Sequence, residues 1–340
     1  GGNHDSGGVR LLSAVSRDGR LDESRFIDLV ARHLGISVDK VVLDFEADRA
    51  LDLLAIVIRQ NDEPVNSLSA VAHYLLMKHA AEMGTTVVLS GQGGDETLCG
   101  YRKYLAFWVQ HLVRKRDYTG AVAAVLPFIM RGTVVSQFSL PEARRYVPFL
   151  ASRERLRTIG PALEGFRLVD LGLSACAGVS ARQALDLQRL TLPAYVHYED
   201  RLSMAFSREV RLPFLDYRFV EKAIALDVRC KLRNGWTKWV LRKAFEGWLP
   251  EDIIWRKDKQ GFLIPQEEWL KTGLRPAVER LVSPDALIFS RGFVRRAALM
   301  EKYRRYSAAP AASGGGIWFK EIFNPIALEI WLREYSQWLS

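Results

Sequence analysis

The segment of this sequence best suited to chemistry is a glycine-rich turn that follows a short apolar run. Residues 90–96 read Ser-Gly-Gln-Gly-Gly-Asp-Glu and come directly after residues 85–89, a β-branched run that predicts a strand. Glycines let backbone amides approach an anion closely and adopt positive φ, and Asp95 offers the hard carboxylate oxygen that Mg²⁺ prefers. The turn therefore predicts a site for phosphate and magnesium, although a simple tight turn explains this segment alone equally well.

Two later segments combine charge with proline or glycine. Glu209 and Arg211 flank an apolar, proline-broken stretch, where charges are costly unless they are paired or functional. Taken alone, a structural ion pair explains them as well as a chemical role does. Residues 256–262 place several cations beside a glycine, and Lys259 there could stabilise negative charge on a transferring phosphoryl group. Without support from other motifs, this segment is better explained as a basic surface turn.

The elements that must position these residues alternate between strands and helices in the first hundred residues. Such alternation predicts a parallel sheet with helices on both faces. From about residue 104 the sequence changes to long helical patterns with no further clear strand. We therefore expect an α/β core over residues 1–103 and a mainly helical continuation of the same domain over 104–340. The predicted strands are 11–15, 41–45 and 85–89, and the predicted helices cover 22–34, 50–58 and 68–84.

Composition describes a soluble globular chain. The 340 residues include 48 Lys and Arg against 39 Asp and Glu, which gives a net charge of +9, and 49% are hydrophobic. The longest nearly apolar stretch, 120–130, is far shorter than the roughly 20 residues of a membrane span, and no basic-then-apolar leader opens the chain. The three cysteines lack paired spacing, which argues against a disulfide framework or a cysteine zinc site. We expect a cytoplasmic protein with no membrane partner.

The positive charge leaves an anionic partner open, because it can indicate nucleic acid, a membrane surface or a small anionic substrate. Two basic clusters lie among helix-like patterns, where a solvated helix face is the simpler explanation. No motif of the common nucleic-acid-binding modules accompanies them, so we expect no nucleic-acid partner.

Taken in order, the motifs resemble the synthetase domain of the glutamine-dependent asparagine synthetase family, which includes β-lactam synthetases and lasso-peptide cyclases. The family has a strand, a Ser-Gly-x-Gly-x-Asp-Glu loop and a following Gly-Tyr, seen here as Gly100-Tyr101. Its Met-x-x-Ser-x-Glu-x-Arg-x-Pro-Phe-Leu-Asp stretch matches residues 204–216. Its Lys-x-x-Leu-Arg motif matches 238–242, and its basic Gly-Phe segment matches the residues around Lys259. The resemblance runs from about residue 11 to residue 331.

The resemblance implies an ATP-binding α/β core of the adenine nucleotide alpha hydrolase-like, PP-loop ATP pyrophosphatase type, with a helical C-terminal part. It implies a ligase in which a carboxylate attacks the α-phosphate of ATP, pyrophosphate leaves with Mg²⁺, and ammonia or an amine displaces AMP to form an amide. The residues that fall on family positions are Val15, Ser90, Gly91 and Gly93 for ATP, Asp95 and Asp5 for Mg²⁺, and Lys259, Glu209 and Gln92 for catalysis. Lys259 would stabilise charged intermediates, and Glu209 would orient or deprotonate the amine.

One departure from the family pattern concerns the nitrogen donor. Gln92 stands where asparagine-forming enzymes have glutamate and β-lactam synthetases have tyrosine. Because an amide is no base at neutral pH, activation of ammonia in the manner of asparagine synthetases is in doubt. A lasso-peptide cyclase or β-lactam-synthetase-like enzyme is the alternative.

The second departure lies at the beginning of the chain. Residues 1–6 are similar to the family's pyrophosphate-binding Ser-Gly-Gly-x-Asp-Ser loop with one residue too many, and the helix expected after it is missing. Either a segment is missing, which we favour, or the loop has decayed, as in a non-catalytic paralogue. The family's glutaminase domain is also missing, so we expect it upstream or in trans, unless the nitrogen nucleophile is not ammonia. The substrate is a small-molecule or peptide carboxylate, and a homodimer is possible.

Overall fold

The computed structural model describes residues 9–16, 22–43, 47–133, 157–166, 171–172, 176–257, 264–310 and 316–338. Asp5 and Lys259, two of the predicted site residues, lie outside these ranges.

The strands form two short parallel sheets rather than one. Strand β1 (Leu11–Val15) pairs with β2 (Val38–Val42), and β3 (Val87–Leu89) pairs with β4 (Glu209–Arg211). Parallel strands need a crossover connection, which helix α1 (Ser24–Leu34) provides between β1 and β2. The predicted parallel pairing is therefore confirmed, but in the described part of the chain it is divided between two sheets.

Two predictions about strands need correction. Strand β2 begins three residues earlier than the predicted 41–45. Strand β4 contradicts the prediction that no clear strand follows residue 104. It escaped prediction because it has only three residues, of which the two charged ones are exposed and only Val210 is partly buried. Such a short segment carries too little apolar alternation to indicate a strand.

Helices make up most of the described residues. Their bounds are α2 (Ala47–Asn61), α3 (Ser69–Glu82), α4 (Gly94–Thr97), α5 (Arg102–Arg114), α6 (Tyr118–Arg131), α9 (Val179–Leu185), α10 (Leu192–Met204), α11 (Tyr217–Ala225), α12 (Val228–Lys231), α13 (Trp239–Ala244), α14 (Glu251–Ile254), α15 (Gln266–Lys271), α16 (Arg275–Leu281), α17 (Leu287–Ser290), α18 (Arg296–Ala308) and α19 (Lys320–Glu334), with 3-10 turns at Pro161–Leu163, Pro213–Leu215 and Ser336–Trp338 and a π-helical turn at Asp186–Leu190.

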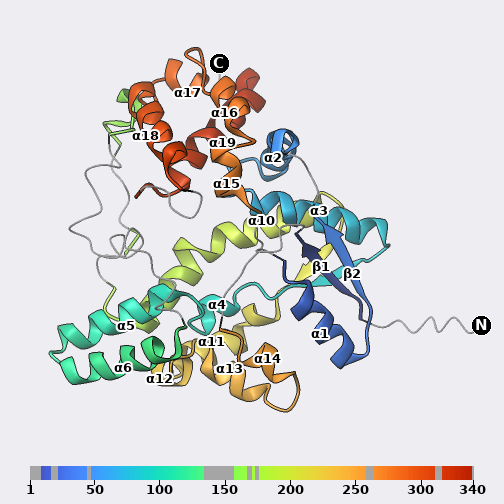
Figure 1. Cartoon of the computed structure of the whole chain (residues 1–340), viewed down its shortest axis with the longest axis vertical. Helices are drawn as coiled ribbons and strands as arrows, with labels where there is room; N and C mark the ends of the chain where they lie inside the picture. The colour runs from blue at the N-terminus through green and yellow to red at the C-terminus, as the bar shows by residue number, and fades with distance from the viewer. Residues whose placement is uncertain are drawn as a thin grey trace, which may run out of the picture.

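The main hydrophobic core joins the N-terminal and C-terminal parts of the chain. Leu54 and Ile58 of α2 belong to the same buried cluster as Phe323 and Ile326 of α19. Figure 1 shows helices α15 to α19 gathered beside α2, with the β1–β2 sheet to one side and α5 and α6 at the opposite end. The α/β part and the C-terminal helices are thus packed as one structure.

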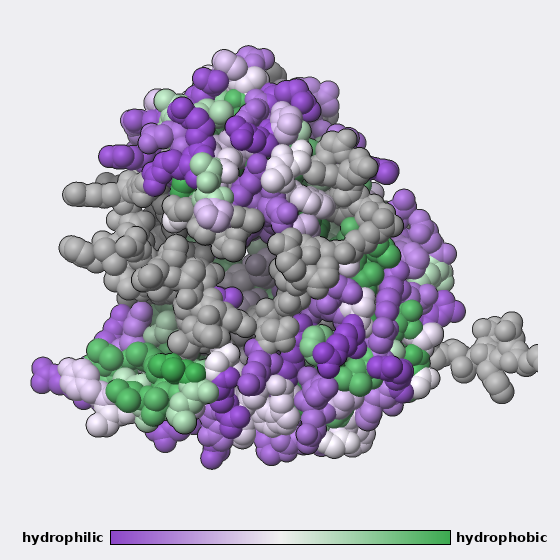
Figure 2. Space-filling view, in the orientation of Figure 1, coloured by the Kyte–Doolittle hydropathy of each residue, from purple (hydrophilic) through white to green (hydrophobic). Residues whose placement is uncertain are grey.

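The surface is largely hydrophilic on the face shown in Figure 2, with a green patch where Figure 1 places α5 and α6. Among the described residues, no helix is both long enough and apolar enough to cross a membrane.

A buried polar network lies beneath α4, the short helix that carries Asp95. The side-chain amide of Gln183 in α9 donates to the carbonyl oxygens of Glu96 and Thr97, at 2.7 and 2.6 Å. Its oxygen accepts a 2.8 Å hydrogen bond from the ammonium of Lys231, a side chain with no exposed surface. The same ammonium donates to the carbonyl oxygen of Ala223 at 2.8 Å. Gln183 therefore fixes α4 to α9 and to the helices that follow the second motif.

We expect the substitution Gln183→Leu to lower the free energy of unfolding by about 3 kcal/mol, because it removes an acceptor from a buried ammonium and a donor from two carbonyls. Urea denaturation measures the change. The matched control is Gln188→Leu, five positions further and exposed, which should stay within about 0.5 kcal/mol of the wild type. Equal stabilities of the two variants would contradict the structural role of Gln183.

Candidate active site

The pairing of β3 with β4 brings the glycine turn and the second motif together. The main-chain N–H of Ser90 donates to the carbonyl oxygen of Arg211 at 3.0 Å, and the N–H of Glu209 donates to that of Thr86 at 3.0 Å. The glycine turn thus leaves the sheet at the carboxyl end of β3, where ligands bind in α/β sheets. Two motifs that are distant in the sequence therefore form one surface.

The glycines of the turn have different surroundings. Gly93 has a φ of 90°, and a Cβ placed on it would lie 2.2 Å from Cδ2 of Leu215. On Gly94 a Cβ would lie 3.3 Å from the ring of Phe214. On Gly91, by contrast, it would meet no atom within 4 Å. Gly93 is therefore required by backbone conformation and packing, whereas the backbone at Gly91 is open to a ligand.

Asp95 is paired with the third motif. Its Oδ1 lies 2.8 Å from Nζ of Lys238, the first residue of the Lys-x-x-Leu-Arg segment, and both side chains are largely buried. A Cβ on Gly100 would lie 1.8 Å from the same carboxylate oxygen. The Gly-Tyr motif is thus explained, because only a glycine at position 100 leaves room for the Asp95 carboxylate.

The residues present fit a magnesium ion that is shared with a substrate. In the described part of the chain, no three His, Cys, Asp or Glu side chains gather in a way that could hold a metal. Mg²⁺ commonly takes only one or two protein carboxylates and completes its shell with phosphate oxygens and water. Asp95 at the edge of a turn with open backbone fits this mode of binding.

Glu209 lies on the surface and is paired with Arg211. Its carboxylate forms an ion pair with Arg211 at 2.7 Å, and more than half of each side chain is exposed. The ion pair that the sequence left open is therefore present, and the role of Glu209 toward an amine stays a prediction. The two side chains lie on the same exposed face as Val87 and Leu89 of β3.

Sequence reasoning missed Glu199, a carboxylate on α10 next to the glycine turn. Its side chain is buried, and burial raises its pKa. The hydroxyl of Ser90 donates a hydrogen bond to this carboxylate, and its oxygen accepts a 3.3 Å hydrogen bond from the N–H of Gln92. Ser90 thus connects Glu199 to Gln92, the residue that departs from the glutamate of asparagine-forming enzymes. The only signal in the sequence was a charge-rich helical stretch before Met204, which does not indicate which acid is buried.

His73 of α3 was also missed. It forms a hydrogen bond with the main chain of Glu199, and burial lowers its pKa to about 4, so the ring is neutral at pH 7. Its Nε2 atom is buried and has no hydrogen-bond partner among the described residues. A neutral imidazole is therefore bound to the main chain of the residue that carries this carboxylate.

The segment that leads to Lys259 is fixed by Arg242. This partly buried guanidinium, whose pKa burial lowers to about 10, donates to the carbonyl oxygens of Ile254 and Arg256. Arg256 in turn forms a 2.6 Å ion pair with Glu23. Lys259 itself and Asp5 cannot be placed, because both lie outside the described residues. Val15 is the buried end of β1, and no strand pairing joins it to the glycine turn.

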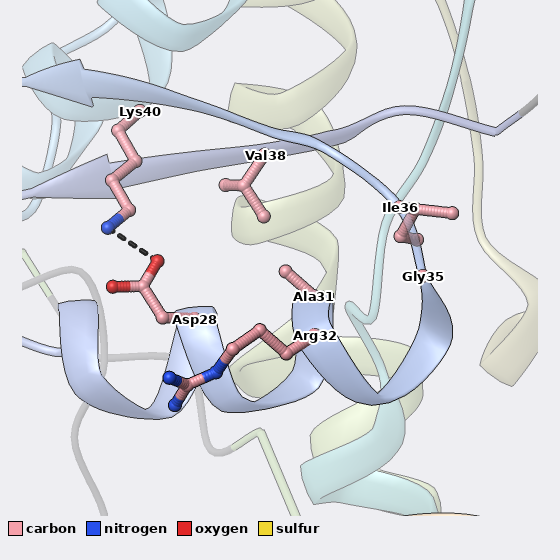
Figure 3. Close-up of a pocket in the computed structure, with 7 residues that line it drawn as sticks. All are labelled: Asp28, Ala31, Arg32, Gly35, Ile36, Val38 and Lys40. Carbon is pink, nitrogen blue, oxygen red and sulfur yellow. Dashed lines mark ion pairs between the residues drawn. The ribbon is translucent and has the colours of Figure 1, made fainter.

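A depression of about 550 Å³ lies away from these residues, between α1 and β2 (Figure 3). Asp28 and Lys40 form a 2.6 Å ion pair across it. None of the predicted site residues that the structure describes lines it, so we do not assign the chemistry to this depression.

The chain belongs to the asparagine synthase family, whose model matches residues 3–333. Among its relatives, asparagine synthetase [glutamine-hydrolyzing] 1 of Bacillus subtilis strain 168 is 27% identical over 310 residues, which cover 86% of this chain and 48% of that protein. A putative asparagine synthetase [glutamine-hydrolyzing] of Mycobacterium tuberculosis strain H37Rv is 31% identical over 264 residues, or 72% of this chain and 38% of that protein. The chain spans about half the length, or less, of these relatives. The expected family resemblance is confirmed.

The two glycines with different surroundings should respond differently to alanine. Gly93→Ala should lower the unfolding free energy by about 2 kcal/mol, because the new Cβ overlaps Leu215 and the positive φ disfavours an L side chain. Gly91→Ala is the matched control, with a change below about 0.5 kcal/mol. Thermal or urea unfolding measures both, and a Gly93→Ala variant as stable as Gly91→Ala would disprove this packing.

His73 should make stability dependent on pH. Its pKa is about 4 in the folded protein against an ordinary 6.5, so only the unfolded chain takes up the proton between these values. Above pH 6.5 the buried ring of His73 therefore costs no stability through protonation. As the pH falls toward 4, proton uptake by the unfolded chain lowers the free energy of unfolding by about 3 kcal/mol. The variant His73→Phe should therefore lose about 3 kcal/mol less than the wild type between pH 7 and pH 4.

Urea denaturation at both pH values measures this difference. His79→Phe, which removes a partly exposed histidine from the same helix, is the control and should follow the wild type. Parallel pH profiles of the wild type and His73→Phe would show that His73 is not buried as a neutral ring.

Proposed function

We propose that this chain is the synthetase part of an ATP-dependent ligase that forms amides. In this proposal a substrate carboxylate attacks the α-phosphate of ATP and becomes an acyl-adenylate, pyrophosphate leaves, and ammonia or an amine displaces AMP. The observation that carries the proposal is the glycine turn at the end of β3, with open backbone at Gly91 and Asp95 held in place by Lys238. Membership of the asparagine synthase family supports a ligase in general. We further propose the PP-loop ATP pyrophosphatase type of fold for the α/β part.

The roles of the residues follow from their chemistry. The amides near Ser90 and Gly91 would bind ATP, with Gly93 shaping the turn and Val15 contacting the nucleotide from β1. Asp95, and Asp5 by resemblance, would hold Mg²⁺, which when bound neutralises charge on the phosphates. Lys259 would stabilise the charged states of transfer.

Gln92 bears on the choice of nitrogen donor. Its amide cannot take a proton from an amine. Glu199 is connected to Gln92 through Ser90, and burial raises the pKa of its carboxyl, which makes it a stronger base than an exposed carboxylate. We therefore propose Glu199, in addition to Glu209, as a carboxylate that acts on the attacking amine.

The relatives are named as glutamine-hydrolysing enzymes. We propose that a glutaminase domain or subunit supplies ammonia to this chain, and that the protein forms a homodimer. We propose the cytoplasm as its location, because all three cysteines are free thiols.

Two variants test the ligase assignment. Asp95→Asn and Lys259→Ala should each reduce carboxylate-dependent exchange of label between pyrophosphate and ATP by at least about 100-fold, because each removes a charge that the transition state needs. The assay uses the full-length protein with aspartate as the first carboxylate. Lys257→Ala, which removes an exposed lysine two positions from Lys259, is the matched control and should keep the exchange.

Retained exchange in both variants would rule out the proposed site. Calorimetry with ATP and Mg²⁺ tests the assignment without knowledge of the carboxylate. Absence of nucleotide binding by the full-length protein would favour a non-catalytic member of the family.

A further inference from the structure

Helix α6 turns an apolar face toward solvent. From Tyr118 to Met130 it contains no charged residue. Met130 is 77% exposed and Val122 is 64% exposed. The large apolar side chains exposed along this helix are Tyr118, Val122, Leu126, Ile129 and Met130. Surface helices of globular proteins normally present polar residues on this side.

The opposite side of α6 already serves the protein's own core. Ala121, Ala124 and Phe128 are buried, and Phe128 belongs to a cluster with Tyr104 and Leu105 of α5. The helix is also capped at both ends, by Asp117, whose carboxylate accepts from the N–H of Gly120 at 2.8 Å, and by Gly132 in the left-handed conformation. The exposed stripe is therefore not needed to fold α6, and a contiguous apolar patch of this kind indicates a binding surface. Figure 2 shows a green patch in the region where Figure 1 places α5 and α6.

Cations stand at the N-terminal end of the stripe, where Lys115 and Arg116 are exposed in the turn between α5 and α6. Arg131, the last residue of the helix, lies seven positions after the buried Ala124 on the same side of α6, and its guanidinium is 5.7 Å from the ring centroid of Trp236. The acid between these two cations and the stripe, Asp117, is engaged as the helix cap. The binding surface is thus an apolar stripe with a positive N-terminal end.

We propose that α6 docks on an anionic phospholipid surface. An amphipathic helix with an apolar face and flanking Lys or Arg settles at the boundary of head groups and acyl chains, where its cations meet lipid phosphates. The net charge of +9 acts in the same direction. The proposal is independent of the ligase assignment. It departs from the expectation that the chain has no membrane partner, which was based on apolar stretches too short to span a membrane.

A second copy of the chain fits this surface less well. A parallel pairing of α6 with α6 of a copy would bring Lys115 and Arg116 of the two copies together. In either direction, two chains that each carry a net charge of +9 repel each other. Like charges that face each other across an interface weaken binding, so charge favours an anionic surface over self-association.

Vesicle flotation of the full-length protein tests this proposal. The protein should float with vesicles that contain phosphatidylglycerol, should float less with phosphatidylcholine alone, and should be released by added salt. The double variant Val122→Ser/Met130→Ser should lower the partition coefficient at least about tenfold, because it removes apolar side chains from the membrane. Lys115→Gln/Arg116→Gln should lower it about thirtyfold on the anionic vesicles. Trp248→Ser, which removes a side chain that is 75% exposed elsewhere, is the matched control and should bind as the wild type does.

Four outcomes would overturn the proposal. They are no flotation of the wild type with anionic vesicles, unchanged flotation of both double variants, an equal loss in the Trp248→Ser control, and a dimer in sedimentation velocity that Val122→Ser/Met130→Ser dissociates. The last would assign the stripe to a second copy. Circular dichroism checks that the variants are folded. If Val122→Ser/Met130→Ser does not fold, Lys115→Gln/Arg116→Gln still tests the proposal.

Discussion

The candidate site depends on one short parallel pairing, that of β3 with β4. Three residues on each strand carry the register, from Val87 opposite Glu209 to Leu89 opposite Arg211. Because the strands are distant in the sequence, the closure of a long loop opposes this pairing, and side-chain packing must compensate for that entropy. The packing is supplied by Phe214 and Leu215, which follow β4 and lie directly against the glycines that follow β3. The glycine turn and the Pro-Phe-Leu segment thus stabilise each other.

Burial shifts the pKa of several polar groups around this pairing, and most of these groups are hydrogen-bonded or paired. Burial keeps His73 neutral, and burial raises the pKa of Glu199 and of Glu96. Glu96 accepts a 3.0 Å hydrogen bond from the hydroxyl of Tyr101. A nearby ion pair between Lys103 and Asp186, at 2.9 Å, balances two charges that would be costly apart. Asp95 therefore lies at the edge of a rigid polar layer, and this rigidity holds a ligand group without reorganisation.

The sequence alone predicted the alternation of strands and helices, their parallel pairing and the glycine turn, because each has a local pattern. Helix α1, for example, ends at Gly35 with positive φ, as the position of that glycine indicated. Local patterns could not reveal the pairing of Asp95 with Lys238, since it joins two distant segments. They also could not show that Glu199 is buried while Glu209 is exposed, because both are acids in charge-rich stretches and only tertiary packing separates them.

Helix α13 links the two parts of the site that the motifs left separate. Lys238, which precedes the helix in the left-handed conformation, pairs with Asp95, and Arg242 one turn later binds the carbonyls before the Lys259 segment. A guanidinium presents several donors in a fixed plane and can hold more than one carbonyl, whereas an ammonium acts as a point charge. Arg242 also donates to the carbonyl of Thr237 at 2.9 Å, next to Lys238. The arginine of this motif thereby fixes both the residue that holds Asp95 and the segment that leads to Lys259. This explains why a lysine just before the short helix α13 and an arginine within it stand four residues apart.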